Sequence, residues 1–362
     1  MNPGRGLHII REDAEQIVRQ LGPRLDAFRS KNVLITGAGG VIGGYVTDAL
    51  AVWNETQTDR DRATLHLLTR RPVTDESRLA HLRGRDDVRF LVQDISDPVS
   101  SSEPLQFIVH TAAPASPEEY RRRPVSAVDA NARALQGLLE RARNDEAEGV
   151  VFLSSSEVYG IRPDEIPTPE TYVGRVDQMA GRAFHAEANR FGETLCVAYN
   201  EQYGLPVRVA RPFHIFGPGF RFGDSRLIPD MIRRGVYGEP LQLLSDGRAT
   251  RSYGYVLDSA RAVLRILLSE GAGVEAYNLG SDESEQSILE TVTIISEICG
   301  CEVAVKRDDQ PRTEYLSGGP QRACPDLSKL RGAFGFEVTV PLREGLARTA
   351  EWATLVSEAD SR

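Results

Sequence analysis

The sequence predicts an α/β protein with a doubly wound parallel sheet and a smaller C-terminal domain. Three observations support this fold class. From Asn32 onward, short apolar runs alternate with longer stretches of helical periodicity; a glycine-rich turn follows the first run; and prolines and glycines cluster after residue 205. Runs without alternating polar residues are typical of strands buried on both faces of a parallel sheet. Repeated strand–helix units then imply a doubly wound fold.

The predicted elements divide the chain into three parts. Residues 1–30 carry apolar residues at helical spacing, interrupted at Gly22-Pro23, and predict a helical extension that serves packing or subunit contact. Residues 31–205 form the predicted first domain. Its strands are Asn32–Ile35, Thr64–Leu68, Val88–Val92, Phe107–Val109 and Val150–Leu153. Residues 206–362 are predicted to form mainly a smaller substrate-binding domain, and we expect the ligand site in the cleft between the two domains.

Composition narrows the class of protein. The 362 residues, 41% of them hydrophobic, suffice for one large domain or two closely joined ones. A formal net charge of −9 argues against nucleic-acid binding, which needs a basic surface. Neither a membrane-length apolar run nor a signal core in residues 1–8 is present, so we expect a cytoplasmic protein without membrane contact. The four cysteines form no Cys-x-x-Cys pair, and no metal site is expected.

The segment 36–43 has the pattern of a phosphate-binding turn. It follows the apolar run 33–35 and opens a helical pattern, with glycines at its second, fifth and eighth positions. Such glycines permit a tight turn, close approach of the backbone to a pyrophosphate, and close packing of helix on strand. The segment therefore predicts a Rossmann-type dinucleotide-binding domain. The expected contacts in this turn are Gly37, Gly40, Val41, Ile42 and Gly43.

The identity of the cofactor, NAD or NADP, stays open at this point. The second predicted strand ends in Thr69-Arg70-Arg71, where NAD-binding proteins usually place a carboxylate on the ribose hydroxyls. Arg70 or Arg71 could instead meet the 2′-phosphate of NADP, or both could simply be solvated. The further expected cofactor contacts, at the ends of the second, third and fourth strands, are Thr69, Arg70, Asp94, Ile95, Ala112, Ala113 and Pro114.

Several motifs beyond the glycine turn match one family. They are His110–Pro117 with Tyr120 and Pro124, Leu153–Gly160, Arg190 with Glu193–Cys196, Ala210–Pro218, Asp246–Tyr253, and Arg322 with Pro325–Leu327. Over roughly residues 31–350 the chain resembles the extended short-chain dehydrogenase/reductase (NAD-dependent epimerase/dehydratase) family, and within it the UDP-glucuronate decarboxylases. The resemblance implies an enzyme that uses NAD(P) to oxidise a sugar nucleotide, with a UDP-sugar favoured, at C4. It also implies a homodimer.

The triplet Ser155-Ser156-Glu157 distinguishes the subfamilies. Similar dehydratases carry Asp-Glu at the last two positions, and Ser156 cannot protonate a leaving hydroxyl as that Asp does. The triplet most resembles the Thr-Ser-Glu of the decarboxylases, with an epimerase as the alternative. We expect Ser155 to hold the C4 oxygen and Glu157 to handle a proton near the sugar. Alternatively, Ser155 is a strand-end hydroxyl with a backbone partner and Glu157 a helix-start carboxylate.

The family's Tyr-x-x-x-Lys pair is replaced here by His185-x-x-x-Asn189. A tyrosine, with a pKa of about 10, needs the lysine, whereas an imidazole, with a pKa of about 6.5, accepts a proton at neutral pH unaided. Asn189 can still hydrogen-bond the ribose hydroxyls. The hypothesis is that His185 is the proton acceptor and Asn189 a ribose contact. The alternative is a silent protein that binds cofactor and sugar nucleotide without oxidising.

The resemblance also implies a substrate side. The expected contacts are Ser116, Tyr120, Glu157, His214, Arg251 and Arg322. Arg251 and Arg322 would hold the diphosphate or the nucleotide, while Ser116 and Tyr120 would face the sugar. His214 stands where the family normally carries Asn, and it would contact sugar or phosphate. The alternative for His214 is a buried, hydrogen-bonded structural histidine.

Overall fold

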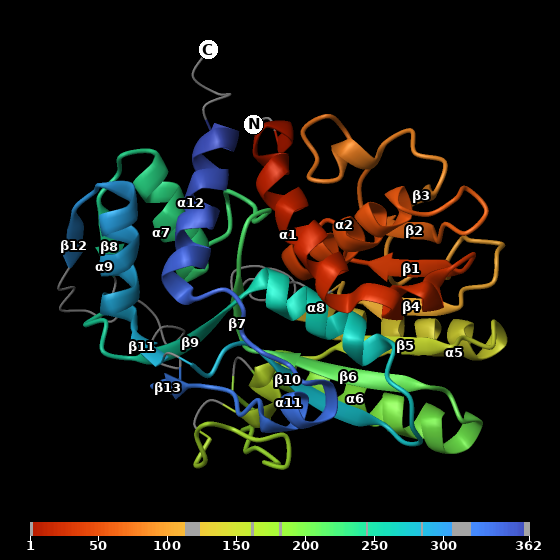
Figure 1. Ribbon diagram of the computed structural model, residues 1–362. Helices are drawn as coiled ribbons and strands as arrows, with labels where there is room; N and C mark the ends of the chain where they lie inside the picture. The colour runs from red at the N-terminus through yellow and green to blue at the C-terminus, as the bar shows by residue number, and fades with distance from the viewer. Residues whose placement is uncertain are drawn as a thin grey trace.

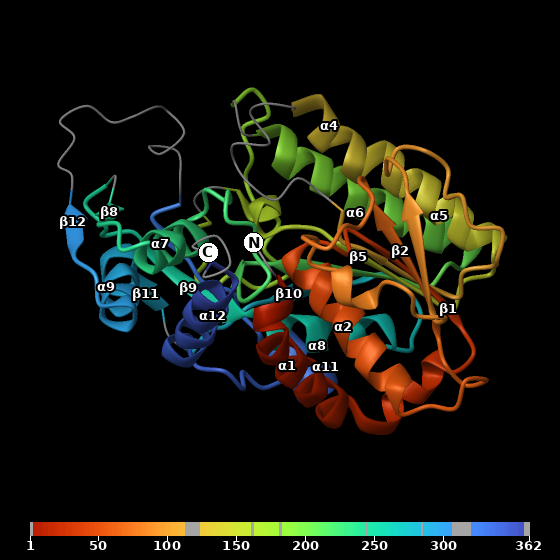
Figure 2. The ribbon, with the colours of Figure 1, turned by 90° about the horizontal axis from the view of Figure 1, so that it is seen from above.

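The computed structural model describes residues 3–112, 124–160, 163–180, 183–243, 245–283, 285–305 and 320–357. Its centre is a seven-stranded sheet in the order β10-β6-β5-β4-β1-β2-β3, with every neighbouring pair parallel. Figures 1 and 2 show α2 and α8 on one face of this sheet and α5 and α6 on the other. The predicted doubly wound parallel sheet is confirmed.

The first five strands occur where the apolar runs predict them. The strands of the large sheet are β1 (Asn32–Thr36), β2 (Thr64–Thr69), β3 (Val88–Val92), β4 (Phe107–His110), β5 (Gly149–Leu153), β6 (Val207–Pro212) and β10 (Glu275–Leu279). Two of them, β6 and β10, follow residue 205 in the chain and complete the sheet beyond β5. The division of the chain into domains at residue 205 stays a prediction.

The helices around the large sheet include one that precedes it in the chain. They are α1 (Leu7–Leu21), α2 (Val41–Glu55), α4 (Pro124–Asp129), α5 (Leu135–Asn144), α6 (Ala183–Tyr203) and α8 (Val256–Leu267). A π-helical segment, η4 (Ala130–Ala134), joins α4 to α5. The shorter 3-10 helices are η1 (Pro3–Gly6), η2 (Gly22–Phe28), η3 (Ala80–Leu82) and η5 (Ser156–Tyr159). Gly22-Pro23, where an interruption is predicted, is the point at which α1 gives way to η2.

A smaller group of elements lies on the side toward which β1 points (Figure 1). It comprises α7 (Leu227–Val236), α9 (Ile288–Cys299), α12 (Leu342–Ser357), β7 (His214–Phe216), β8 (Leu241–Leu243), β9 (Thr250–Tyr255), β11 (Glu285–Ser287), β12 (Val303–Val305) and β13 (Arg322–Ala323). Helix α11 (Ser328–Phe334) instead lies beside β10 at the edge of the large sheet (Figure 1). The central strand of this group is β9, which pairs with β7, β11 and β13.

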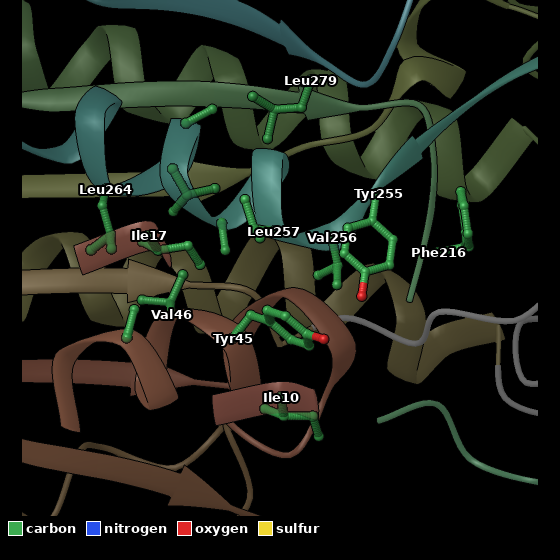
Figure 3. Packing of buried hydrophobic residues seen from close by; sticks show 14 of the residues in the cluster. Ile10, Ile17, Tyr45, Val46, Phe216, Tyr255, Val256, Leu257, Leu264 and Leu279 are labelled. Atoms are coloured by element: carbon green, nitrogen blue, oxygen red, sulfur yellow. The ribbon is translucent and has the colours of Figure 1, made fainter. Parts of the chain in front are cut away.

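One large apolar cluster joins α1, α2 and α8 to the smaller group. Figure 3 shows Ile10 and Ile17 of α1 near Tyr45 of α2 and Tyr255 of β9, all of them buried. Burial of this many apolar side chains supplies the main force that holds the layers together. Among the described residues, every helix is too short or too polar to cross a bilayer.

Candidate functional site

A cleft of about 2510 Å³ runs along the carboxyl ends of the large sheet and reaches the smaller group. All predicted site residues within the described ranges line it: Gly37, Gly40, Val41, Ile42, Gly43, Thr69, Arg70, Asp94, Ile95, Ala112, Ser155, Glu157, His185, Asn189, His214, Arg251 and Arg322. Ala113, Pro114, Ser116 and Tyr120 lie outside the described residues. The tertiary structure therefore brings the predicted cofactor and substrate residues together, while their individual roles stay predictions.

The glycine turn packs directly against the segment that follows β4. Gly37 has a φ of +68°, and a Cβ there would lie 2.7 Å from the Thr111 hydroxyl oxygen. A Cβ at Gly43 would lie 2.5 Å from that same oxygen and 2.6 Å from the carbonyl oxygen of Gly37. Only glycine fits these positions, and the bare backbone at the start of α2 leaves its N–H groups open to an anion.

The buried His110 holds the glycine turn against the segment that follows β4. The Nδ1 atom of His110 lies 2.7 Å from the Thr36 hydroxyl, and its Nε2 lies 3.3 Å from the carbonyl oxygen of Ala130. Burial lowers the pKa of His110 to about 4, so the imidazole is neutral and Nε2–H is the donor to Ala130. The Thr36 oxygen also accepts from the N–H groups of Thr111 and Ala112, at 3.2 and 3.3 Å. Sequence reasoning used His110 only as the start of a motif.

At the end of β2, the basic residues have an acidic neighbour. Arg70 and Arg71 are exposed, and the Thr69 hydroxyl donates to the carbonyl of Arg71 at 2.9 Å. Hydrogen bonds from Ser96 lower the pKa of Asp94, and the positive charge of Arg70 lowers it further. Arg70 and Asp94 both line the cleft at this edge of the sheet.

The end of β5 presents Ser155 and Glu157 to the cleft. Ser155 caps η5, and its oxygen accepts the backbone N–H of Glu157 at 3.1 Å. Because Ser155 acts as an acceptor in that bond, its own hydroxyl hydrogen can still be donated to a ligand oxygen. Glu157 is half-buried in the first turn of η5. The backbone partner considered for Ser155 is thus present, and it leaves the ligand role open.

A buried polar network fixes the loop that carries these two residues. The Ser154 hydroxyl donates to Glu193 at 2.6 Å, and Glu193 accepts two hydrogen bonds from Arg211, at 2.9 and 2.6 Å. Arg211 also donates to the hydroxyl of Tyr159 at 2.9 Å, which in turn donates to Asn278 at 2.7 Å. Burial raises the pKa of Tyr159 to about 12, so this phenol is committed to structure. The network connects β5, α6, β6 and β10.

His185 and Asn189 lie one turn apart on the buried face of α6. Their side chains are 6% and 1% exposed. The Asn189 amide nitrogen donates to the main-chain carbonyl of His185 at 2.8 Å and lies 3.5 Å from each ring nitrogen of His185. Asn189 therefore stands beside the imidazole without adding charge, and its amide oxygen remains an acceptor.

The side of the cleft formed by β7 and β9 carries the predicted substrate residues His214 and Arg251. His214 on β7 pairs with Tyr253 on β9, and their rings are 5.7 Å apart. Burial lowers the pKa of His214 to about 3, and the charges of Arg251 and Arg226 act in the same direction. A neutral imidazole in the same cleft wall as two guanidinium groups suits an anionic ligand that needs both charge and a hydrogen bond.

Arg226 was missed by sequence reasoning, and its partner explains how it is placed. It is hydrogen-bonded to Asp224, two residues earlier, at 2.9 and 2.6 Å. Arg251 is 9% exposed and donates to the carbonyl of its neighbour Thr250 at 2.7 Å. Arg322 is more exposed and is paired with Glu285 at 2.8 Å. The Asp-x-Arg pattern at 224–226 was the available signal, but such turns are common.

A model of the NAD dependent epimerase/dehydratase family matches residues 33–280, from β1 through β10. The chain belongs to this family. Its members include curated relatives such as UDP-glucuronic acid decarboxylase 1 of Xenopus tropicalis, which is 31% identical over 322 residues, 89% of this chain and 72% of that protein. The matched region of this epimerase/dehydratase family member contains the glycine turn, the β5 loop, α6 and β9.

Two solved structures resemble this family member closely in fold. Epimerase Mth375 from Methanothermobacter thermautotrophicus has a TM-score of 0.79 at 25% identity, covering 94% of this chain and 97% of that one. MoeE5, solved in complex with UDP-glucuronic acid and NAD, has a TM-score of 0.72 at 25% identity, covering 89% and 98% of the two chains. The fold is therefore that of sugar-nucleotide-modifying enzymes.

Proposed function

We propose that this protein is a NAD-dependent decarboxylase of a UDP-glucuronate-like sugar nucleotide. The observation that carries the proposal is the single cleft in which the glycine turn, Ser155, Glu157, His185 and the cationic β7–β9 side meet. The similarity to UDP-glucuronic acid decarboxylases and to a structure that holds UDP-glucuronic acid and NAD supports the substrate and cofactor assignment.

The residues present fit NAD. The glycines at 37 and 43 let the turn pack tightly against Thr111, which places the first backbone N–H groups of α2 at the cleft, where a pyrophosphate would bind. The similarity to MoeE5, whose solved structure holds NAD, supports NAD as the cofactor. Asn189 would hold ribose hydroxyls through its amide. When bound, NAD would accept a hydride from C4 of the sugar.

In this proposal His185 removes the proton from the C4 hydroxyl while Ser155 donates a hydrogen bond to the C4 oxygen. The neutral neighbour Asn189 lets the imidazole take up this proton, whereas a lysine would oppose the imidazolium. The C4 ketone lies β to the sugar carboxylate, so the C5–C6 bond breaks, CO₂ leaves, and the electrons pass to the C4 oxygen that Ser155 holds. Glu157 then handles the proton that is returned to C5.

On the substrate side, Arg251 and Arg226 would neutralise the diphosphate, and the neutral His214 would donate a hydrogen bond to it. Arg322 would contact the nucleotide from β13. These assignments rest on the position of the three side chains in the wall of one cleft and on the lowered pKa of His214. Tyr159 is excluded as the base in this proposal because its hydroxyl is already bonded to Asn278.

The test is incubation of the protein with UDP-glucuronate and NAD, followed by detection of CO₂ and of the sugar-nucleotide product. We expect CO₂ release that is lost in His185→Ala. A C4 epimer without CO₂ would point to the epimerase alternative. Tight nucleotide binding without any turnover would point to the silent alternative, which the His185–Asn189 pair keeps open. CO₂ release that persists in His185→Ala would remove His185 from the mechanism.

A further inference from the structure

The N-terminal helix α1 lies between the two parts of the molecule. It packs against α2 and α8 on the large sheet and also contacts α12 of the smaller group. Figures 1 and 2 both show α1 with α2 on one side and α12 on the other. The first turn of this helix reaches the cleft, where Leu7 and Ile10 are part of the wall. Helix α1 therefore contacts both the elements that carry the predicted cofactor residues and the smaller group that carries predicted substrate residues.

One buried carboxylate on α1 connects these supports. Asp13 is 1% exposed, and its Oδ2 atom accepts from the hydroxyls of both Tyr45 and Tyr255, at 2.8 and 2.7 Å. Its Oδ1 atom accepts from Arg348 of α12 at 2.8 Å. In Figure 3 the hydroxyl oxygens of Tyr45 and Tyr255 point toward a common space between their elements. Asp13 therefore joins α1, α2, β9 and α12.

The two tyrosines belong to two elements that line different parts of the cleft, the helix after the glycine turn and the strand that carries Arg251. Tyr45 is the fifth residue of α2, one turn beyond the glycine cradle that starts this helix. Tyr255 is the last residue of β9, the strand that carries Arg251. A shift of either tyrosine relative to Asp13 would change the distance between the cofactor cradle and the cationic side of the cleft.

Arg78 makes a second contact between α2 and the smaller group of elements. The guanidinium of Arg78 lies 5.6 Å from the centre of the Tyr45 ring and donates to Asp48 of α2 at 2.7 Å. A Cβ at Gly44 would lie 2.3 Å from the Arg78 Cζ atom, and one at Gly219 would lie 2.6 Å from its Nε atom. Arg78 thus fills the space between α2 and the loop that follows β7.

Hydrogen bonds fix the distance between two elements more strictly than apolar contacts do. Apolar surfaces can slide with little loss of burial, whereas three donors that converge on one carboxylate require a particular distance and angle. Burial raises the pKa of Asp13, so the ionised carboxylate depends on all three donors for its stability. Loss of one donor should therefore weaken the packing among α1, α2, β9 and α12, and not only the contact that is removed.

We infer that Asp13 is a positioning residue, which through Tyr45 and Tyr255 sets the spacing between the cofactor helix α2 and the substrate strand β9. This inference rests on the proposed function only in requiring that ligands bind on both sides of the cleft. It assigns to the N-terminal helix a part in the geometry of the site, although no atom of Asp13 reaches the reacting groups.

The first experiment measures hydrogen exchange of the ligand-free protein in Tyr45→Phe, Tyr255→Phe and the double variant. Each change removes one hydroxyl and leaves the buried ring. We expect Tyr45→Phe to speed exchange in β9, and Tyr255→Phe to speed exchange in the first turns of α2, each by about tenfold. The double variant should show less than the product of the two effects, because both hydroxyls serve the same oxygen.

The matched control is Tyr199→Phe on α6, which removes a hydroxyl bonded to Glu140 at 3.3 Å on the opposite face of the sheet. It should leave exchange in α2 and β9 unchanged. If Tyr45→Phe alters exchange only within α2, or Tyr255→Phe only within β9, the inference is wrong. This readout needs no ligand, so it decides the role of Asp13 even if the protein proves not to be a decarboxylase.

The second experiment titrates UDP into the NAD-saturated protein. We expect the double variant to bind UDP about tenfold more weakly than the wild type, with NAD affinity alone changed less, because UDP contacts the side that moves relative to α2. Tyr199→Phe should match the wild type. Unchanged UDP affinity in a folded double variant would overturn the inference. If UDP binding is weakened as expected but the wild type releases no CO₂, the result counts only against the proposed reaction.

Discussion

Arg211 binds both carboxylate oxygens of Glu193, at 2.9 and 2.6 Å, and so ties strand β6 to helix α6. Both side chains are largely buried, at 13% and 16% exposure. The same carboxylate accepts from Ser154, immediately before the predicted catalytic Ser155. The pair therefore supports the stability of the sheet and the placement of the β5 loop together.

Glu193→Gln should destabilise the fold by about 3 kcal/mol, because it leaves the buried guanidinium of Arg211 without its counter-charge. Urea unfolding at neutral pH measures this free energy. Glu140→Gln is the control, since Glu140 is paired with Arg143 on the solvent-exposed side and should change stability little. Equal effects of the two substitutions would show that the Arg211–Glu193 pair contributes no more than a surface pair.

Gly43→Ala should weaken NAD binding by at least about tenfold, since the new Cβ would force the cradle away from Thr111. Gly137→Ala on α5 is the control, because a Cβ at Gly137 meets no atom within 4 Å and this residue does not line the cleft. Calorimetric titration with NAD compares the two. Equal affinities in both variants would argue against the cradle as the cofactor site.

Stability should fall as the pH drops from about 6.5 toward 4, partly through His110. Its pKa in the folded state is about 4, below the value of an unfolded chain. Between these values the unfolded state binds the proton and the folded state does not, so each imidazole of this kind removes about 1.4 kcal/mol per pH unit as the pH falls. His110→Gln should reduce this slope in urea unfolding between pH 7 and 5. An unchanged slope would contradict the role given to His110.

Asn189→Lys should reduce CO₂ release by roughly tenfold or more at pH 7 if His185 is the base, since a positive charge beside the imidazole disfavours its protonated form. Asn189→Gln, which keeps the amide, should retain more activity than Asn189→Lys. The kcat of each variant with UDP-glucuronate checks this order. Faster turnover in Asn189→Lys would indicate that the site works by the logic of the usual Tyr–Lys pair, and that His185 is not the proton acceptor.

The apolar runs and the glycine turn could be recognised from the sequence because they are local patterns. Strands β1 to β5 are short buried runs. The turn at 36–43 needs glycine because its backbone lies too close to neighbouring atoms to leave space for a Cβ. Strand β10 (Glu275–Leu279) was harder to predict, since it is an edge strand with a polar start and its partner β6 is far away in the chain.

The sequence could propose which residues belong to the site, but not how they contact one another. The residue types at 155, 157, 185 and 189 indicate chemistry by themselves. In contrast, Arg226 became a candidate only because the structure places it in the same cleft wall as His214 and Arg251. The bond from the Tyr159 hydroxyl to Asn278 is likewise seen only in the structure.

By itself, the sequence predicted five strands of the large sheet, the glycine turn and the family, because each of these is signalled by short motifs whose residues are adjacent in the chain. Only the tertiary structure decided that Asp13 meets Tyr45 and Tyr255, and that Arg211 meets Glu193. Such contacts join segments up to 242 residues apart. They depend on how the layers pack, which no local pattern specifies.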